Sequence, residues 1–218
     1  MGKRSSASDL VYLELKKKII ELEYKPEDVV SEEMLCGEFG VSRTPLRQAL
    51  YRLELEGLIV KQSNGRMHVA PVSIQEAEEI FKVREVLEGL IAREAAQRIT
   101  PSEIDHLKDL LELMRRAAQQ KRIIDTIKYG SQFHHQLYEP SQNKTAINFL
   151  AQLRSRIERY RRLSGYTNPR YDTLLPVEEH EAILKAIMAR DEVLAEKEMR
   201  AHIRRSLVST IETLQLKT

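Results

Sequence analysis

The pattern of apolar residues changes once along this chain, near Pro71, and that change limits the folds open to it. Before Pro71, helical stretches are followed by two short β-type runs, 58–60 and 67–69, around an Asn-Gly pair. Asn-Gly between such runs is the strongest local signal for a β-hairpin. After Pro71, every long stretch has helical spacing and none resembles a strand. The sequence therefore predicts a mainly α chain, with a small α+β module over 1–72 and an all-α bundle over 73–218.

Capping residues and glycines divide the chain into helices. In the first module, helices are expected at 8–24, 31–39 and 42–56. In the second part, six are expected, at 74–98, 101–119, 121–138, 144–164, 173–190 and 191–215. Gly40 follows the second helix where a left-handed residue is favoured, and Pro45 falls in the first turn of the third, where a missing N–H costs nothing. A helix, a tight glycine turn, a second helix and a hairpin follow one another in a winged helix-turn-helix.

The third expected helix begins with polar and basic side chains suited to DNA. Arg43 and Arg47 lie four residues apart on one face and can reach guanine edges or phosphates. The full set of candidate DNA contacts is Ser42, Arg43, Thr44 and Arg47 on the helix and Asn64, Gly65 and Arg66 in the hairpin turn. The alternative is that these arginines form only a solvated helix face.

The net charge of the chain does not by itself indicate a nucleic-acid partner. The 35 Lys and Arg residues face 33 Asp and Glu residues, so the formal net charge is +2. This balance argues against a uniformly basic coat. Between residues 41 and 53, however, there are three arginines and no acidic residue. We expect a selective DNA binder that leans on base and shape readout, because non-specific binding depends on positive charge.

Other function classes leave no trace in the sequence. One cysteine, Cys36, excludes an internal disulfide framework and an all-cysteine metal cage. No apolar run approaches the length of a membrane helix, and the first residues lack the apolar stretch of a signal peptide, so a cytoplasmic protein is expected. The fingerprints H-E-x-x-H, G-x-S-x-G, the P-loop and the Rossmann glycines are all missing, so an enzyme is not expected.

The stretch 31–50, S-E-E-M-L-C-G-E-F-G-V-S-R-T-P-L-R-Q-A-L, continues as Y-R-L-E-L-E-G-L-I. It resembles the DNA-binding module of GntR-type bacterial transcriptional regulators. The resemblance implies that Arg43, Thr44 and Arg47 bind operator DNA, while the wing at 64–66 touches the groove. Some relatives carry an arginine near the start of the second helix. This chain has Glu32 and its acidic neighbour there, so no base contact is expected from that position.

The part from 73 to 213 resembles the FCD domain, an all-α effector-binding bundle attached to one GntR subfamily. The motifs that carry the resemblance are F-x-x-R-x-x-x-E at 81–88, Q-F-H at 132–134, E-H-x-x-I at 179–183 and M-x-x-H at 199–202. The resemblance implies a divalent metal held by an Asp and three histidines, the latter at His134, His180 and His202. This sequence has Gly130 at the position of the Asp.

Helical spacing supports two of the three histidines as inward-facing. His134 and His180 share faces with apolar residues, whereas His202 lies at the edge of its stripe. Three neutral imidazoles can hold Zn²⁺ or Ni²⁺, with water or an effector oxygen completing the shell. A metal-free pocket is the alternative, and so is a set of ordinary hydrogen-bonded core histidines.

Four further residues are candidates for an effector site. Arg154 and Arg161 align with the apolar stripe of the helix at 144–164, and Arg84 stands one turn from apolar neighbours. Buried arginines are rare without an anion, so a small anionic metabolite, most simply a carboxylate, is expected. Tyr138, one turn beyond the first histidine, could close the pocket. The alternative is that the arginines pair with Glu88, Glu158 or Glu181, or reach the surface.

These features together predict a transcription factor that responds to a ligand. A homodimer would set two recognition helices into successive major grooves of double-stranded DNA, so its operator should be an inverted repeat. Repression relieved by the effector is the commoner behaviour in the family. Two alternatives stay open: a constitutive dimeric DNA-binding regulator without metal or effector, and a metalloenzyme.

Overall fold

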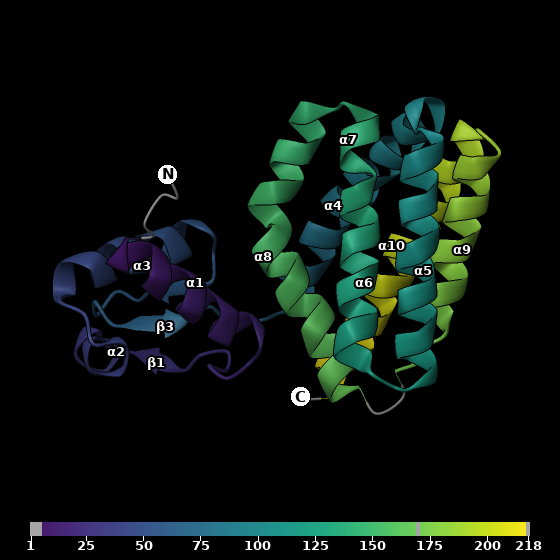
Figure 1. Cartoon of the computed structure of the whole chain (residues 1–218). Helices are drawn as coiled ribbons and strands as arrows, with labels where there is room; N and C mark the ends of the chain where they lie inside the picture. Colours follow the sequence, from purple (N-terminus) through teal and green to yellow (C-terminus); the bar gives the residue numbers. More distant parts are fainter. Residues whose placement is uncertain (1–5, 169–170, 217–218) are drawn as a thin grey trace. The chain divides into compact units, whose positions relative to one another are not determined.

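The computed structural model describes residues 6–168 and 171–216. The chain divides into two compact units. One comprises Met1–Val72 with Gln152–Arg159, and the other comprises Ser73–Ala151 with Tyr160–Thr218. The predicted architecture, a winged helix-turn-helix followed by a helical bundle, is confirmed (Figure 1). Within the described residues, no helix is long and apolar enough to cross a lipid bilayer.

The N-terminal unit contains three helices, α1 (Ala7–Ile20), α2 (Glu32–Phe39) and α3 (Arg43–Leu55). The α1 helix starts at a capping box between Ser6 and Asp9 and ends at Ile20, four residues before the predicted end. It stops because Leu22 adopts a left-handed backbone conformation, with φ of 63°.

Local capping chemistry sets the turn between α2 and α3. The Ser31 hydroxyl accepts a hydrogen bond from the Met34 amide at 3.2 Å, and Gly40 closes α2 with φ of 63°. Ser42 occupies the N-cap position of α3, but its side chain makes no capping hydrogen bond. Its exposed hydroxyl therefore stands at the start of the helix without an intrahelical role.

The wing is a three-stranded antiparallel sheet in the order β1-β3-β2. Its strands are β1 (Val29–Val30), β2 (Ile59–Lys61) and β3 (Met67–Val69). The predicted hairpin is present, with β2 one residue later than expected. Gly65, at φ of 81°, donates its amide hydrogen bond to the Gln62 carbonyl at 2.8 Å in the turn. The β1 strand was not predicted; its two residues pair with His68 and Met67.

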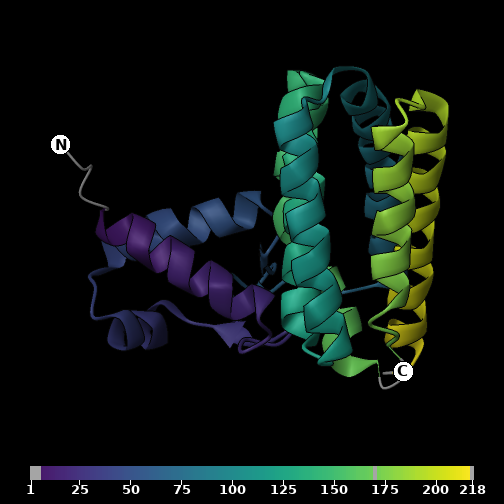
Figure 2. The ribbon, with the colours of Figure 1, turned by 45° about the vertical axis from the view of Figure 1, so that its right-hand side comes forward.

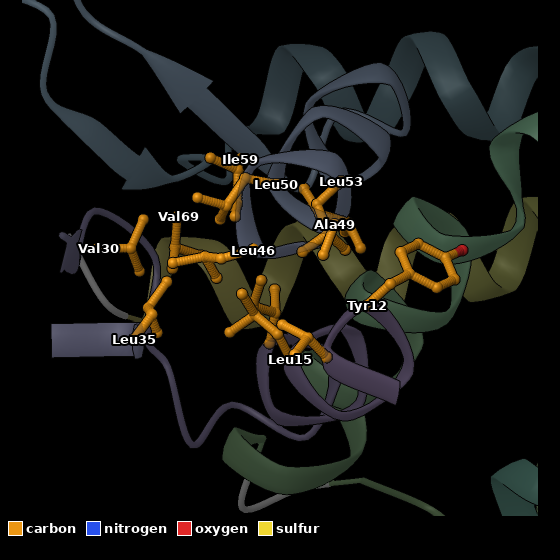
Figure 3. Close-up of a cluster of buried hydrophobic side chains, with 13 residues drawn as sticks. Tyr12, Leu15, Val30, Leu35, Leu46, Ala49, Leu50, Leu53, Ile59 and Val69 are labelled. Carbon is orange, nitrogen blue, oxygen red and sulfur yellow. The ribbon is translucent and has the colours of Figure 1, made fainter. Parts of the chain in front are cut away.

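A single apolar cluster fills the N-terminal unit (Figure 3). The α3 helix contributes Leu46, Ala49, Leu50 and Leu53, which are at most 2% exposed. Leu15 from α1 and Val69 from β3 pack into the same cluster. Because one face of α3 is buried in this way, the opposite face, with its arginines, is held toward solvent.

The second unit is a bundle of α-helices. Its elements are α4 (Ile74–Arg98), α5 (Pro101–Gln119), α6 (Ile123–Gln136), α7 (Tyr138–Ser141), α8 (Lys144–Thr167, except for residues 152–159), α9 (Leu175–Met188) and α10 (Glu192–Gln215). The long helices run side by side, and α9 and α10 lie together in both views (Figures 1 and 2). The α9 helix also packs against α4, α5 and α6. Positions on α4, α6, α9 and α10 can therefore share one interior.

Most predicted helix boundaries in the bundle hold within a few residues. Thr100 forms a complete capping box with Glu103 at the start of α5. The Ser73 hydroxyl accepts from the Glu76 amide at 3.1 Å, while the Glu76 carboxylate accepts from the Tyr160 hydroxyl at 2.6 Å. The helix predicted at 121–138 is present as α6, which ends at Gln136, and the short α7 that follows it was not predicted. Pro140 in α7 has no N–H to continue the α6 hydrogen-bond ladder.

The α3 packing face yields a stability prediction. Leu46→Ala should destabilise the N-terminal unit by about 2–5 kcal/mol, because it removes a fully buried side chain and leaves a cavity. Hydrogen exchange of the α3 amides in the full chain should then accelerate. Leu55→Ala is the matched control, since Leu55 is 70% exposed on the same helix. Equal protection in the two variants would refute the assigned core face.

Candidate metal and effector site and DNA-binding face

Three histidines from three helices meet inside the bundle. His134 lies on α6, His180 on α9 and His202 on α10, and all three side chains are buried. Each offers a ring nitrogen, and these nitrogens lie within 4.8 Å of one another. The spacing on α10 placed His202 at the edge of its apolar stripe. It is nevertheless only 4% exposed, because α10 packs against both α4 and α9.

The second nitrogen of each ring is held by the protein. The Nδ1 atoms contact Glu88 Oε2 (His134, 3.3 Å), the Pro176 carbonyl (His180, 2.6 Å) and the Glu179 carboxylate (His202). A carbonyl or an ionised carboxylate can only accept, so Nδ1 carries the proton in each ring. Each neutral imidazole then presents an Nε2 lone pair to the cluster. This is how proteins orient histidines that bind metals.

The Nε2 atoms have the surroundings that a cation requires. His134 Nε2 and His202 Nε2 lie 3.2 Å apart, with lone pairs facing one another. Two nitrogen ligands of a tetrahedral zinc ion are separated by about 3.3 Å. His180 Nε2 is buried and has no hydrogen-bond partner among the described residues. The three imidazoles therefore fit a divalent metal, and the buried triad could bind one.

The electrostatics of the cluster keep the rings neutral. Burial lowers the pKa of His134 well below the ordinary histidine value, and the nearby Arg84 guanidinium lowers it further. Burial followed by Arg84 does the same to the pKa of His202. For His180, burial and the neighbouring His202 lower the pKa. Neutral rings are the form that binds metal, so no proton has to leave these nitrogens near pH 7.

Arg84, from α4, lies beside the first histidine. Its side chain is 2% exposed, with Nε 3.6 Å from Glu88 Oε1 and Nη2 3.5 Å from His134 Nε2. Burial raises the pKa of Glu88. The charge of Arg84 opposes this rise, and a hydrogen bond from Tyr138 opposes it more weakly. Tyr138 thus contacts the carboxylate that holds His134.

Two carboxylates that orient histidines were not among the sequence-based site residues. Glu88 stands four residues after Arg84, and Glu179 directly precedes His180, but it holds the ring of His202 on another helix. Their motifs were visible in the sequence. Their partners were not, because each contact crosses from one helix to another. Glu179 also accepts a hydrogen bond from Arg205, and burial raises the Glu179 pKa.

A cavity of about 350 Å³ opens beside the cluster. The described side chains that line it include His202, Glu179, Arg161, Arg205, Ser164, Ser206, Ser209, Tyr171, Asp172 and Glu212. Arginine and histidine side chains thus share the cavity with several hydroxyl groups and three acidic residues, two of which are exposed. Such a cavity can hold a small polar molecule that carries an anionic group.

Arg154 and Arg161, which align along one face of α8, lie in different surroundings. Arg161 lines the cavity and donates a hydrogen bond to the Ser131 hydroxyl. Arg154 has a side chain that is 57% exposed and is paired with Glu158 at 3.2 Å. Arg154 was expected to bind the effector, but its position does not match that role. It forms instead the ion pair with Glu158 that the sequence offered as the alternative. A helical stripe that is buried at one end need not be buried seven residues earlier.

All seven candidate DNA contacts are exposed in the N-terminal unit. Arg43, Thr44 and Arg47 lie on the face of α3 opposite its buried leucines, and residues 64–66 form the tip of the wing. The Arg47 Nε atom lies 2.8 Å from Glu32 Oε1, and this contact lowers the pKa of Glu32. The sequence did not indicate that ion pair, which joins two helices.

Arg52, the third arginine of the acid-free window, has a structural role. It forms an ion pair with Asp9 at 2.8 Å, and its guanidinium lies 3.6 Å from the centre of the Tyr12 ring. These contacts tie α3 to α1. The exposed arginines of α3 are therefore Arg43 and Arg47.

These features define a DNA-binding regulator built on a winged helix-turn-helix, with a helical domain that encloses a polar site. Comparisons with known families agree. The model of the bacterial regulatory proteins of the gntR family matches residues 7–69, and the FCD domain model matches residues 79–205. The chain therefore belongs to the GntR family of bacterial transcriptional regulators and carries an FCD domain.

Individual relatives support the assignment. The chain is 30% identical to the Uxu operon regulator of Haemophilus influenzae over 84% of its length and 73% of that protein. It is 27% identical to the transcriptional repressor RspR of Escherichia coli, over 88% and 84% respectively. The Escherichia coli McbR/YncC structure shares the fold, with a TM-score of 0.79, 21% identity and coverage of 95% and 98%. The two named relatives from Haemophilus influenzae and Escherichia coli are regulators, as the sequence led us to expect of this chain.

The buried histidines predict a pH-dependent stability for the metal-free chain. Their folded-state pKa values lie below the unfolded value of about 6.5, so the unfolded state takes up protons first as the pH falls. Their contribution to stability is present above about pH 6.5 and is lost below it. The urea concentration at the midpoint of unfolding should therefore decrease as the pH is lowered from about 7.5 to about 5.5.

His180→Gln isolates this effect. Burial raises the pKa values of Glu88 and Glu179, so these two carboxyls change the stability with pH in the opposite direction to the histidines. Both carboxyls are present in the variant and in wild type, so their contribution cancels when the two proteins are compared. The variant should lose less stability over the same pH range. An identical pH dependence in the two proteins would contradict a neutral, buried His180.

Proposed function

We propose that this regulator is a repressor that binds an inverted-repeat operator as a homodimer, with its DNA-binding domain at 1–72 and its dimerising effector domain at 73–218. A small carboxylate, bound with a divalent metal in the bundle, changes its operator affinity. The observation that carries the proposal is the convergence of three Nε2 atoms beside a cavity lined by Arg161 and Arg205. A named relative that is a repressor supports the sign of regulation.

Operator recognition is assigned to the exposed face of α3 and to the wing. Arg43 and Arg47 would read base edges or phosphates in the major groove, with Ser42 and Thr44 on phosphates. Asn64, Gly65 and Arg66 would approach the neighbouring groove. Asn64 already folds its side chain back to accept from the Arg66 amide at 2.9 Å, which shapes the tip of the wing.

His134, His180 and His202 would hold the metal. Zn²⁺ and Ni²⁺ are the candidates, because imidazole ligands suit both ions. The metal would supply a Lewis-acidic position that can take an oxygen of the effector. Arg84 and Tyr138 act through the carboxylate of Glu88, which holds the ring of His134.

The effector is proposed to be a small acid that carries hydroxyl groups. A cavity of about 350 Å³ suits a metabolite, since ligand pockets range from about 300 to 1,000 Å³. Arg161 and Arg205 can receive the carboxylate, while the hydroxyls of Ser164 and Ser206 can bond a hydroxylated chain. Arg154 lies outside the described lining of the cavity and has no part in this proposal. Effector and operator affinities would be linked through the two domains.

One observation favours the alternative of a constitutive dimeric regulator. The Nη2 atom of Arg84 lies 3.5 Å from His134 Nε2, so a guanidinium can satisfy this ring nitrogen in place of a metal. Gly130 supplies no ligand where the family has an Asp. Metal binding separates the two functions.

Arg47→Ala should weaken binding to the regulator's own upstream DNA by about tenfold or more, because one direct contact is worth about 1–3 kcal/mol. Gel shift or fluorescence anisotropy at fixed salt measures the change. Arg154→Ala removes the same charge from an exposed position outside the proposed contacts and is the control. If Arg47→Ala binds as tightly as wild type, the recognition helix is wrongly assigned.

Chelated and reloaded wild-type protein should bind one Zn²⁺ or Ni²⁺ per chain in calorimetry and elemental analysis. His134→Ala should abolish this binding, and Glu88→Gln should weaken it by about 10–100-fold, as expected for a group that orients a ligand. His106→Ala, at an exposed position of α5, should leave binding unchanged. Absence of metal binding by wild type would favour the constitutive regulator.

A further inference from the structure

Gly130 faces the histidine cluster from α6, one turn before His134. A Cβ atom at this position would lie 3.1 Å from Arg161 Nη2, 3.4 Å from Met114 Cε and 3.5 Å from His180 Cε1. Any side chain at residue 130 would therefore enter the space between the ring of His180 and the guanidinium of Arg161. Glycine leaves that space to Arg161.

Other contacts hold Arg161 in this place. Its Nη1 atom donates to the Ser131 hydroxyl, and its Nη2 atom lies 3.5 Å from the Ile127 carbonyl oxygen. The same side chain lines the cavity together with His202. Arg161 thus lies at the wall of the cavity and also close to the ring of His180.

A guanidinium so close to the cluster opposes any positive charge placed there. Its charge contributes to lowering the pKa of each of the three histidines. The same repulsion would act on a metal ion at the Nε2 atoms, and Arg84, with Nη2 3.5 Å from His134 Nε2, would add to it. An anion placed against Arg161 would relieve the repulsion and could offer an oxygen to the metal.

We propose that Arg161, in the space left by Gly130, makes metal binding and anion binding mutually dependent in this chain. The metal binds weakly alone, because three neutral imidazoles face two guanidiniums. A carboxylate in front of Arg161 raises the affinity for the metal, and by reciprocity the metal raises the affinity for the carboxylate by the same factor. The inference rests on the metal site and acidic effector proposed above, and adds a coupling between them.

The test measures Ni²⁺ affinity of the full-length protein by calorimetry, in sodium acetate and in sodium perchlorate of equal ionic strength. Acetate is the carboxylate probe, and perchlorate is a weakly coordinating anion. Wild type should bind Ni²⁺ at least about fivefold more tightly in acetate, the lower end of typical coupling factors. The visible spectrum of bound Co²⁺ should also differ between the two salts, because an acetate oxygen joins the metal. Sodium sulfate as a third salt tells whether any oxyanion suffices or a carboxylate is required.

Two variants locate the coupling. Arg161→Gln keeps a donor for Ser131 but removes the charge, so Ni²⁺ should bind more tightly than to wild type in perchlorate and gain little from acetate. Gly130→Asp supplies an internal carboxylate, so its Ni²⁺ affinity should also lose most of the dependence on acetate. Arg154→Gln, from the exposed part of the same helix, should behave as wild type.

The outcomes separate the coupling from the site itself. If wild type binds Ni²⁺ equally well in both salts, the metal site stands and the coupling is overturned. Full acetate dependence in Arg161→Gln overturns the assignment to Arg161. If wild type binds no Ni²⁺ in either salt, the proposed metal function fails and the coupling fails with it. Circular dichroism of each variant confirms that the bundle is folded.

Discussion

The interior of the helical bundle is organised around the hydrogen-bonding requirements of three buried imidazoles. Burial keeps each ring neutral, and each Nδ1 forms a hydrogen bond with an oxygen atom from another helical turn or another helix. The Nε2 atoms are thereby left to converge, at a separation that suits a cation better than it suits two facing lone pairs. The carboxylates of Glu88 and Glu179 orient two of the rings, and the cavity lies beside His202.

The parts of the fold that could be predicted are those set by local chemistry. The starts of α2, α4 and α5 follow from Ser31, Ser73 and Thr100, each of which caps its own helix within three residues. The hairpin follows from its Asn-Gly turn. The β1 strand could not be predicted, because two residues become a strand only by pairing with β3, almost forty positions away. The split between α6 and α7 carried a signal in Pro140 that helical periodicity concealed.

The candidate site shows the same division. Resemblance to the FCD domain implied the histidines, and helical spacing supported two of them, but neither could tell which carboxylate would hold which ring. Arg154 and Arg161 share one stripe of α8 by spacing, yet one faces solvent and the other lines the cavity. Spacing fixes the face of a helix, whereas the neighbours of that face depend on tertiary packing. Gly130 was read as a missing ligand, and the structure adds that a guanidinium fills its place.

The ion pair between Glu32 and Arg47 has a consequence for how the regulator responds to ionic strength. An arginine that is already neutralised by its own protein exchanges a carboxylate for a phosphate when it meets DNA. If Arg47 contacts operator DNA as proposed, the displaced Glu32 would be left near the phosphates, where it would repel them or attract a solvent cation. Fewer counterions are released in total than for an unpaired arginine, so operator binding should vary less steeply with salt than the number of phosphate contacts implies. The ion pair would thus lower the affinity for non-specific DNA more than the affinity for an operator, because base contacts in the operator compensate for the loss of the ion pair.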